Sequence, residues 1–249
     1  RESSSSAPPT KEVTEETITW YNLPLCPMYL GVKEMMLKYG ATGIAIRSLV
    51  PWMRKMLNVT PCLVIAELNK QLKVGVCEGL VNNAITQMFG IYIANRLSFV
   101  GDVIGIDTIN EVVTFAHCQA PINPHGNDKV PYIIRSFVHT SMVGLSPGAV
   151  LKVELPIDET ITVTKFSLYH KKIAISSGTT VPGGKFYKDF DNIGCRTKVV
   201  MQTNAEAFER NYDTHTFGVH RNIIYGDYRK EIKNLATLIG LEVVEEDKS

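Results

Sequence analysis

The chain has 249 residues, which is long enough for one large domain or two ordinary domains around a buried core. Hydrophobic residues make up 45% of it and charged residues 20%, as in an average soluble globular protein. The formal net charge of +1 argues against nucleic acid or an anionic membrane surface as a partner. No apolar run approaches the roughly 18 residues of a membrane span, so we expect no membrane contact.

The first half of the chain alternates between strand-like and helix-like segments. Residues 1–16 are rich in Ser, Pro and Glu and predict a flexible tail. Helices are predicted over 32–38, 48–57 and 79–94, and strands over 43–46, 74–77, 97–100 and 111–116. The segment 62–66 fits either a strand or the start of a short helix. This alternation predicts an α/β domain over residues 17–140, with a mostly parallel sheet and flanking helices.

The second half changes to short alternating runs separated by turns. Strands are predicted over 149–155, 160–168, 172–176 and 197–202, followed by a short helix over 205–210. A helix over 229–239 and a strand over 241–244 end the chain. This pattern predicts a small antiparallel β-barrel-like domain over residues 141–249, closed by that helix and strand.

The five cysteines are widely spaced and form no C-x-x-C pair, which argues against a zinc knuckle. Most lie in apolar runs, a pattern typical of buried free thiols in a reducing compartment, so we expect a cytoplasmic protein. The chain has no signal peptide at its start. It begins without a methionine and on a polar tail, which suggests a fragment of a longer protein.

Four residues stand where a side chain can be presented to a metal ion: Glu78, Asp102, His117 and His220. The first three follow apolar, strand-like runs, and ligands bind at strand ends in open α/β sheets. Carboxylates and a neutral imidazole form a shell that suits a divalent cation. Each residue also has an ordinary interpretation, because Glu78 can cap a helix, Asp102 can form a turn, and a lone histidine often packs in a core.

The segment from Val76 to Thr86, which contains Glu78, resembles the L-fucose isomerase and L-arabinose isomerase superfamily. In that family a strand ends in a metal-binding glutamate, and a second strand ends in a metal-binding acid about two dozen residues later. Asp102 stands 24 residues after Glu78. The segment from His220 to Gly226 is similar to the family's C-terminal metal-binding histidine segment, and the one around His117 is similar to a further histidine segment of the arabinose isomerase branch.

The resemblance implies an enzyme that isomerises an aldose to a ketose through an enediol, with a free sugar such as L-fucose or L-arabinose as substrate. Glu78, Asp102 and His220 would bind Mn²⁺, with Mg²⁺ or Co²⁺ as substitutes, and the two carboxylates would carry protons between the sugar carbons. His117 would be a further ligand or would bind the sugar. Arg135, in a strand-like run, would anchor a sugar hydroxyl unless it is a surface charge.

The family also forms trimers or hexamers, so the resemblance implies a homotrimer or homohexamer. We expect this chain to lack the N-terminal α/β domain of that family. Two alternatives therefore remain open: a fragment or relative that binds metal or sugar without turnover, and a scaffold of the same fold with a fortuitous carboxylate pair.

Overall fold

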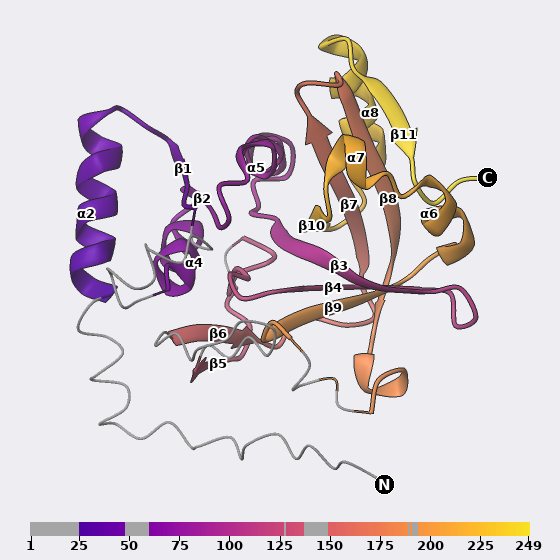
Figure 1. Ribbon diagram of the computed structural model, residues 1–249, viewed down its shortest axis with the longest axis horizontal. Helices are drawn as coiled ribbons and strands as arrows, with labels where there is room; N and C mark the ends of the chain where they lie inside the picture. The colour runs from indigo at the N-terminus through magenta and orange to yellow at the C-terminus, as the bar shows by residue number, and fades with distance from the viewer. Residues whose placement is uncertain (1–24, 48–59, 127, 137–148, 189, 191–193) are drawn as a thin grey trace, which may run out of the picture.

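The computed structural model describes residues 25–47, 60–126, 128–136, 149–188, 190 and 194–249. Figure 1 shows a mixed α/β molecule in which a large sheet lies beside a smaller helical layer built from the first part of the chain. The predicted tail over residues 1–16 and the predicted helix over 48–57 lie outside the described residues. None of the described helices is long and apolar enough to cross a membrane.

The helical layer begins with α2 (Leu25–Lys38) and contains strands β1 (Gly43–Ala45) and β2 (Val74–Val76), which pair in parallel. The segment that fitted either a strand or a helix forms α4 (Cys62–Lys70). Its apolar residues recur with helical spacing, and Ile65 and Leu68 pack against Val32 and Met36 of α2. Helix α5 (Val81–Ala94) follows β2 and packs against β7 and β10 of the large sheet.

The large sheet has seven strands in the order β11-β8-β7-β10-β3-β4-β9. The predicted parallel arrangement is wrong for β3 (Phe99–Asp107) and β4 (Val112–His117), which pair with each other in an antiparallel manner. A short turn joins them, whereas a parallel pair needs a long crossover connection. The sheet takes strands from both sides of residue 140, and the domain division predicted there stays a prediction.

The antiparallel strands predicted for the second half are confirmed. They are β6 (Ala149–Val153), β7 (Thr160–Ser167), β8 (Lys172–Val181) and β9 (Thr197–Gln202). Strand β8 pairs with β7 and also with β9, and the parallel pair β11–β8 lies at the edge of the sheet. β5 (Tyr132–Ser136) pairs with β6 in a separate two-stranded sheet. The closed barrel stays a prediction.

Several shorter elements complete the chain after β8: η1 (Gly183–Lys185), α6 (Ala205–Asn211), α7 (Thr214–Phe217), β10 (His220–Tyr225), α8 (Arg229–Leu238) and β11 (Glu242–Glu245). The predicted last helix and last strand are therefore confirmed. Strand β10 was not predicted, although it lies in the middle of the sheet, between β3 and β7. All six of its residues are buried, so it lacks the alternation of apolar and polar residues that identifies a half-exposed strand.

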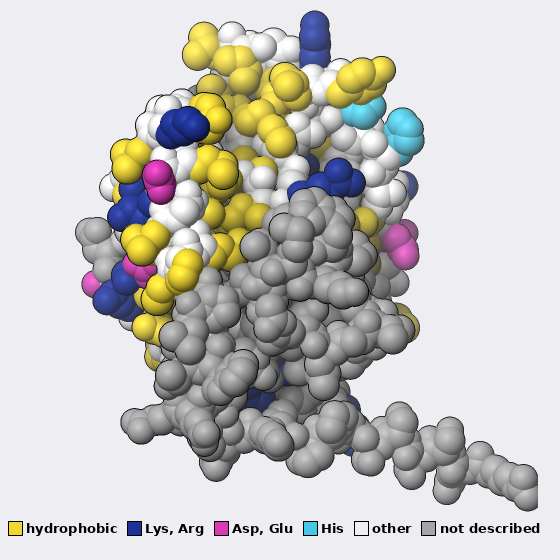
Figure 2. All heavy atoms as spheres, turned by 60° about the vertical axis from the view of Figure 1, so that its left-hand side comes forward, with side chains coloured by type: hydrophobic (Ala, Val, Ile, Leu, Met, Phe, Trp, Pro, Cys, Tyr) yellow, Lys and Arg dark blue, Asp and Glu magenta, His cyan; other side chains and the backbone are white. Residues whose placement is uncertain are grey.

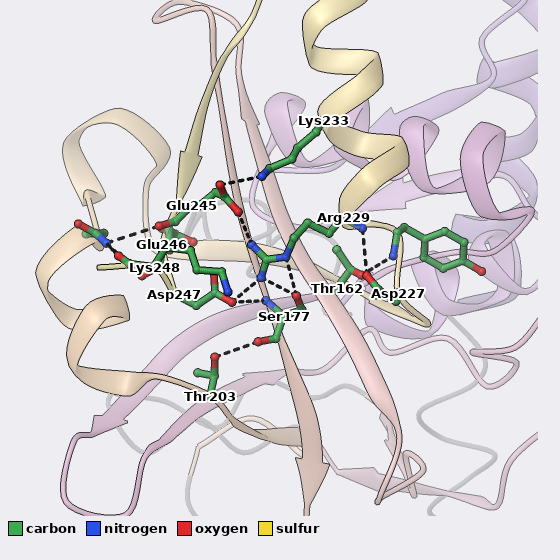
Figure 3. Close-up of polar contacts among 12 residues, drawn as sticks. Thr162, Ser177, Thr203, Asp227, Arg229, Lys233, Glu245, Glu246, Asp247 and Lys248 are labelled. Carbon is green, nitrogen blue, oxygen red and sulfur yellow. Dashed lines mark hydrogen bonds and ion pairs between the residues drawn. The ribbon is translucent and has the colours of Figure 1, made fainter.

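Ion pairs fix the C-terminal segment to the sheet (Figure 3). Arg229 of α8 contacts Glu245 at 2.8 Å and also bonds Asp247 and Ser177 of β8. Arg221 and Glu246 form a second pair at 2.6 Å, and both side chains are fully buried. These contacts hold β11 parallel to β8 and place the end of the chain against β10.

Candidate metal centre

Glu78 lies in the tight connection between β2 and α5. Its φ angle is +62° and that of Gly79 is +71°, so two consecutive residues have left-handed backbone conformations. This conformation is unfavourable for glutamate, although five other described non-glycine residues share it, Glu111 among them. Two hydrogen bonds hold the turn, since the N–H of Gly79 donates to Ile46 and that of Leu80 donates to Cys77.

Asp102 and His220 meet through the register of the sheet. They are directly opposite each other on the antiparallel strands β3 and β10, which places both side chains on one face. The Nε2 atom of His220 lies 2.7 Å from Oδ1 of Asp102 and 3.4 Å from Oε2 of Glu78. The expectation that a strand ends at Asp102 is wrong, because β3 continues to Asp107 with an irregularity after Val103.

His117 is the last residue of β4 and is buried. Its Nε2 atom lies 3.9 Å from Oε1 of Glu78, and its ring centroid lies 5.6 Å from that of His220. The N–H of Cys118 donates to Nδ1 of His117 at 2.9 Å. A neutral imidazole that accepts at Nδ1 carries its proton on Nε2, and the 3.9 Å between His117 Nε2 and Glu78 is beyond hydrogen-bond distance.

The donor set suits a divalent cation. The ligand atoms of Glu78, His117 and His220 all lie within 4.8 Å of one another, with Asp102 beside His220. An octahedral ion with bonds of about 2.1 Å holds its ligand atoms roughly 3 to 4 Å apart, so most of these separations fit with little movement. The contact between Asp102 and His220 is slightly shorter than this range. Two carboxylates with imidazole form a shell that suits Mn²⁺, Mg²⁺ or Co²⁺.

Arg135 is the one predicted site residue that lies on a different sheet. It is half-buried on β5, opposite Val150 of β6. The pKa of Arg196 is lowered first by burial and then by the positive charge of Arg135, so the two side chains lie near each other. Its predicted role in sugar binding stays a prediction.

All five cysteines are free, and Cys62, Cys77 and Cys118 are buried. The pKa of Cys195 is raised, first by a hydrogen bond with Cys118, then by burial and by the negative charges nearby, which include Asp102 and Glu78. Cys195 packs against Cys62 and Cys118, and the carboxylates of Asp102 and Glu78 therefore belong to its electrostatic surroundings together with these thiols.

A pocket of about 490 Å³ opens beside these residues. Gly79 and His220 contribute to its lining, and so does Lys165 of β7. Burial, followed by repulsion from Arg221, lowers the pKa of Lys165 to about 7. Sequence reasoning missed Lys165, because a lysine is expected to be exposed, although the alternation of β7 places it on the same face as Ile161 and Val163.

Sequence reasoning also missed a polar network behind the site. Asn83 of α5 donates to Asn222 of β10 at 2.7 Å, and Asn222 donates to Ser98 at 2.8 Å. All three side chains are buried. The signal in the sequence was the pair Asn82–Asn83 at the start of an otherwise apolar helix. The network fixes α5, and with it the turn of Glu78, against the strand of His220.

No family model matches the chain. The chain is 25% identical over 195 residues to the sulfoquinovose isomerase of Clostridium sp. (strain MSTE9). The match covers 73% of this chain and 39% of that relative, so the chain spans about two fifths of the relative's length. This similarity supports a relationship to sugar isomerases in general. The more specific resemblance to fucose and arabinose isomerases stays a prediction.

Proposed function

We propose that this chain forms the metal site of an aldose–ketose isomerase that acts on a free sugar. The observation that carries the proposal is the convergence of Glu78, Asp102 and His220 from three separate segments, with His220 Nε2 at 2.7 and 3.4 Å from the two carboxylates. The similarity to a sugar isomerase supports the same reaction class. Aldose–ketose isomerisation is an intramolecular oxidation and reduction, so no external oxidant is needed.

The proposed chemistry needs a group that removes a proton from C2 of the aldose and returns it to C1, and a second transfer between the two oxygens. Glu78 and Asp102 provide two carboxylates beside one another for these transfers through an enediol. A divalent ion, with Mn²⁺ as the first candidate, would supply Lewis acidity toward the two sugar oxygens. His117, with its proton on Nε2, would donate to Glu78 or to a sugar hydroxyl, which favours its role in substrate binding over ligation. Arg135 is proposed as a second sugar-binding residue.

The substrate class is proposed as a hexose or pentose aldose. The resemblance favours L-fucose or L-arabinose, whereas the relative that matches is a sulfoquinovose isomerase. A pocket of about 490 Å³ is of the size that holds small ligands in proteins. The sugar is therefore placed with its reacting end at Glu78 and His220 and its remaining carbons in this pocket.

The proposed assembly is a cytoplasmic homotrimer or homohexamer. Helix α2 leaves three large apolar side chains exposed, Leu30, Met35 and Leu37, and Tyr39 directly after it is exposed as well. Figure 2 shows hydrophobic side chains gathered on the face of the molecule that carries this helical layer. Apolar surface of this kind is typical of contacts with another chain or domain.

The test is Mn²⁺ affinity and isomerase activity, measured on the protein and on the Glu78→Gln and His220→Ala variants. Stoichiometric Mn²⁺ binding that both variants lose, together with turnover of an aldose, is the expected result. Glu111→Gln is the matched control, because Glu111 is an exposed glutamate that also has a positive φ angle, at +55°. A protein that binds no Mn²⁺ would refute the metal site.

The second candidate is a protein that binds metal or sugar without turnover. The observation that favours it is the length of the chain, which spans about two fifths of the relative that it matches. It predicts Mn²⁺ binding by this chain without isomerisation, and activity once the remaining domains are supplied.

A further inference from the structure

The pocket beside the metal centre lies where two strands separate. Strand β10 pairs with β7 only as far as Asn222 and Thr164. Beyond that point β7 bonds to α5 instead, since the N–H of Phe166 donates to Oγ1 of Thr86 at 3.0 Å and Lys165 donates to Asn83. The start of α5, the end of β7 and the short helix α7 therefore surround one space, which His220 also lines.

Lys165 is an unusual residue for the wall of this pocket. Only 4% of it is exposed, and buried ammonium groups are normally paired with a carboxylate. Among the described residues Lys165 has no acidic partner, and its acceptor is the neutral side-chain oxygen of Asn83. An ammonium has three N–H donors, so two remain for a ligand. No aspartate or glutamate is among the residues that line the pocket.

The N-terminus of α5 adds a second positive feature to the same pocket. Residues 79–82 contribute to the lining; Val81 and Asn82 are the first residues of this 14-residue helix, and Leu80 is its N-cap. The first turn contains no acidic residue, and Leu80 at the N-cap position provides no side-chain acceptor. Helix N-termini of this kind attract anions, because the first N–H groups lack partners within the helix and the helix dipole is positive there.

We propose that this pocket binds an anionic substituent at the end of the sugar remote from its reacting carbons, and that Lys165 is the residue that selects for it. The inference rests on the proposed isomerase function and names the substrate class of that site. One lysine and one helix N-terminus match a single negative charge, so a sulfonate or a carboxylate fits better than a doubly charged phosphate.

Neutral groups around the pocket complete the recognition of such an anion. Ser167 contacts Nδ1 of His170 at 3.0 Å, and the ring of His170 lies 5.8 Å from that of His215. All three residues line the pocket. Hydroxyl and imidazole groups supply directional hydrogen bonds to the oxygens of a sulfonate or carboxylate.

The experiment compares sugars that differ in their charged group. Sulfoquinovose and 6-deoxyglucose share one carbon skeleton, and only the first carries a sulfonate. Glucuronate supplies a carboxylate, and glucose 6-phosphate supplies a phosphate. Affinities are measured by titration calorimetry on the Mn²⁺-loaded protein, and we expect the sulfonated or carboxylated sugar to bind at least about tenfold more tightly than 6-deoxyglucose, as a charge-assisted hydrogen bond in a buried site would give.

Variants of Lys165 test whether this residue carries the preference. Lys165→Gln keeps a donor for Asn83 and should bring the ratio of the two affinities close to one, whereas Lys165→Arg keeps the charge and should retain most of the ratio. Lys70→Gln is the matched control, because Lys70 lies on α4 and pairs with Glu67. The ratio of the two sugar affinities should be the same for Lys70→Gln as for the unmodified protein. An equal affinity for charged and neutral sugars, or a preference that survives in Lys165→Gln, would overturn the inference.

Turnover and affinity are measured separately, so that failure of this inference can be told from failure of the proposed function. A protein that turns over neutral sugars without preferring an anionic one would retain the isomerase proposal and refute the role of Lys165. A protein that prefers the sulfonated sugar but isomerises no sugar would retain the role of Lys165 and refute the isomerase. If both proposals hold, the unmodified protein isomerises the sulfonated sugar and binds it more tightly than 6-deoxyglucose, Glu78→Gln loses turnover, and Lys165→Gln loses the difference in affinity.

Discussion

Lys165 allows a prediction about stability that needs no ligand. Its pKa is lowered from 10.5 to about 7, mainly because burial disfavours the ammonium form. At roughly 1.4 kcal/mol for each pKa unit, this difference corresponds to at most about 5 kcal/mol of lost stability when the group is charged in the folded protein. The Lys165→Met variant removes that charge from the interior.

The sign of the effect follows from proton binding. Between pH 7 and pH 10.5 the unfolded chain keeps a proton on Lys165 that the folded protein has released. The free energy of unfolding therefore rises with pH across this window, and the full cost is present below about pH 7. Lys165→Met also leaves Asn83 without its donor, which costs about 1 kcal/mol. We expect the variant to be more stable by about 2 to 4 kcal/mol at pH 6, and slightly less stable than the unmodified protein near pH 10.

Urea unfolding at pH 6, 8 and 10 measures this difference, and a comparison of variant with unmodified protein cancels the other titrating groups. Lys70→Met is the control, because Lys70 is partly exposed and its contribution should be nearly constant over the same range. A difference between Lys165→Met and the unmodified protein that does not change with pH would contradict a buried, unpaired charge at Lys165.

Three further predictions concern the site and the fold. Glu78→Gly should relieve the left-handed backbone strain and raise stability by up to about 1 kcal/mol while abolishing Mn²⁺ binding, whereas Glu111→Gly should raise stability alone; urea unfolding and Mn²⁺ titration measure both. Gly178→Ala should cost more than about 2 kcal/mol, since a Cβ there would overlap the main-chain oxygen of Gln202, and the open Gly184→Ala should be tolerated. Arg221→Met should cost about 3 to 5 kcal/mol by leaving Glu246 charged and buried, and Arg221→Met with Glu246→Leu should recover most of it; equal losses in single and double variants would contradict this reasoning.

The local elements of this fold were predictable where the apolar pattern repeats. Helix α5 and strand β7 are examples, because their periodicities of 3.6 and 2 are clear in the sequence. The pairing of strands was not predictable in the same way. An alternation of strands and helices suggested a parallel sheet, but β3 and β4 form a hairpin whose partners lie about 100 residues later in the chain.

For the candidate site, too, the residues were predictable from local sequence but their arrangement in space was not. Glu78, Asp102, His117 and His220 were singled out from short contexts, and the structure brings all four together. What brings Asp102 and His220 into contact is the register of β3 and β10. A shift of one residue would place His220 on the other face of the sheet. No local pattern specifies this register, because all six residues of β10 are buried.

Two unfavourable features lie near the pocket, although a left-handed backbone also occurs elsewhere, at Leu72 and Glu111 for example. Arg221 and Glu246 are fully buried, but they form an ion pair with each other, as expected for charges retained in a core. By contrast, the strained backbone of Glu78 and the buried ammonium of Lys165 have no such structural compensation among the described residues. Lys165 lines the pocket, and Glu78 directly precedes the lining residue Gly79. The start of α5, which has no side-chain cap, lines the same pocket. Selection for stability alone would remove such features, since a neutral residue at position 165 and a glycine at position 78 would each fold more favourably. The buried lysine and the start of α5 in the wall of this pocket, with His220 beside them, therefore support the proposal that the pocket binds a ligand.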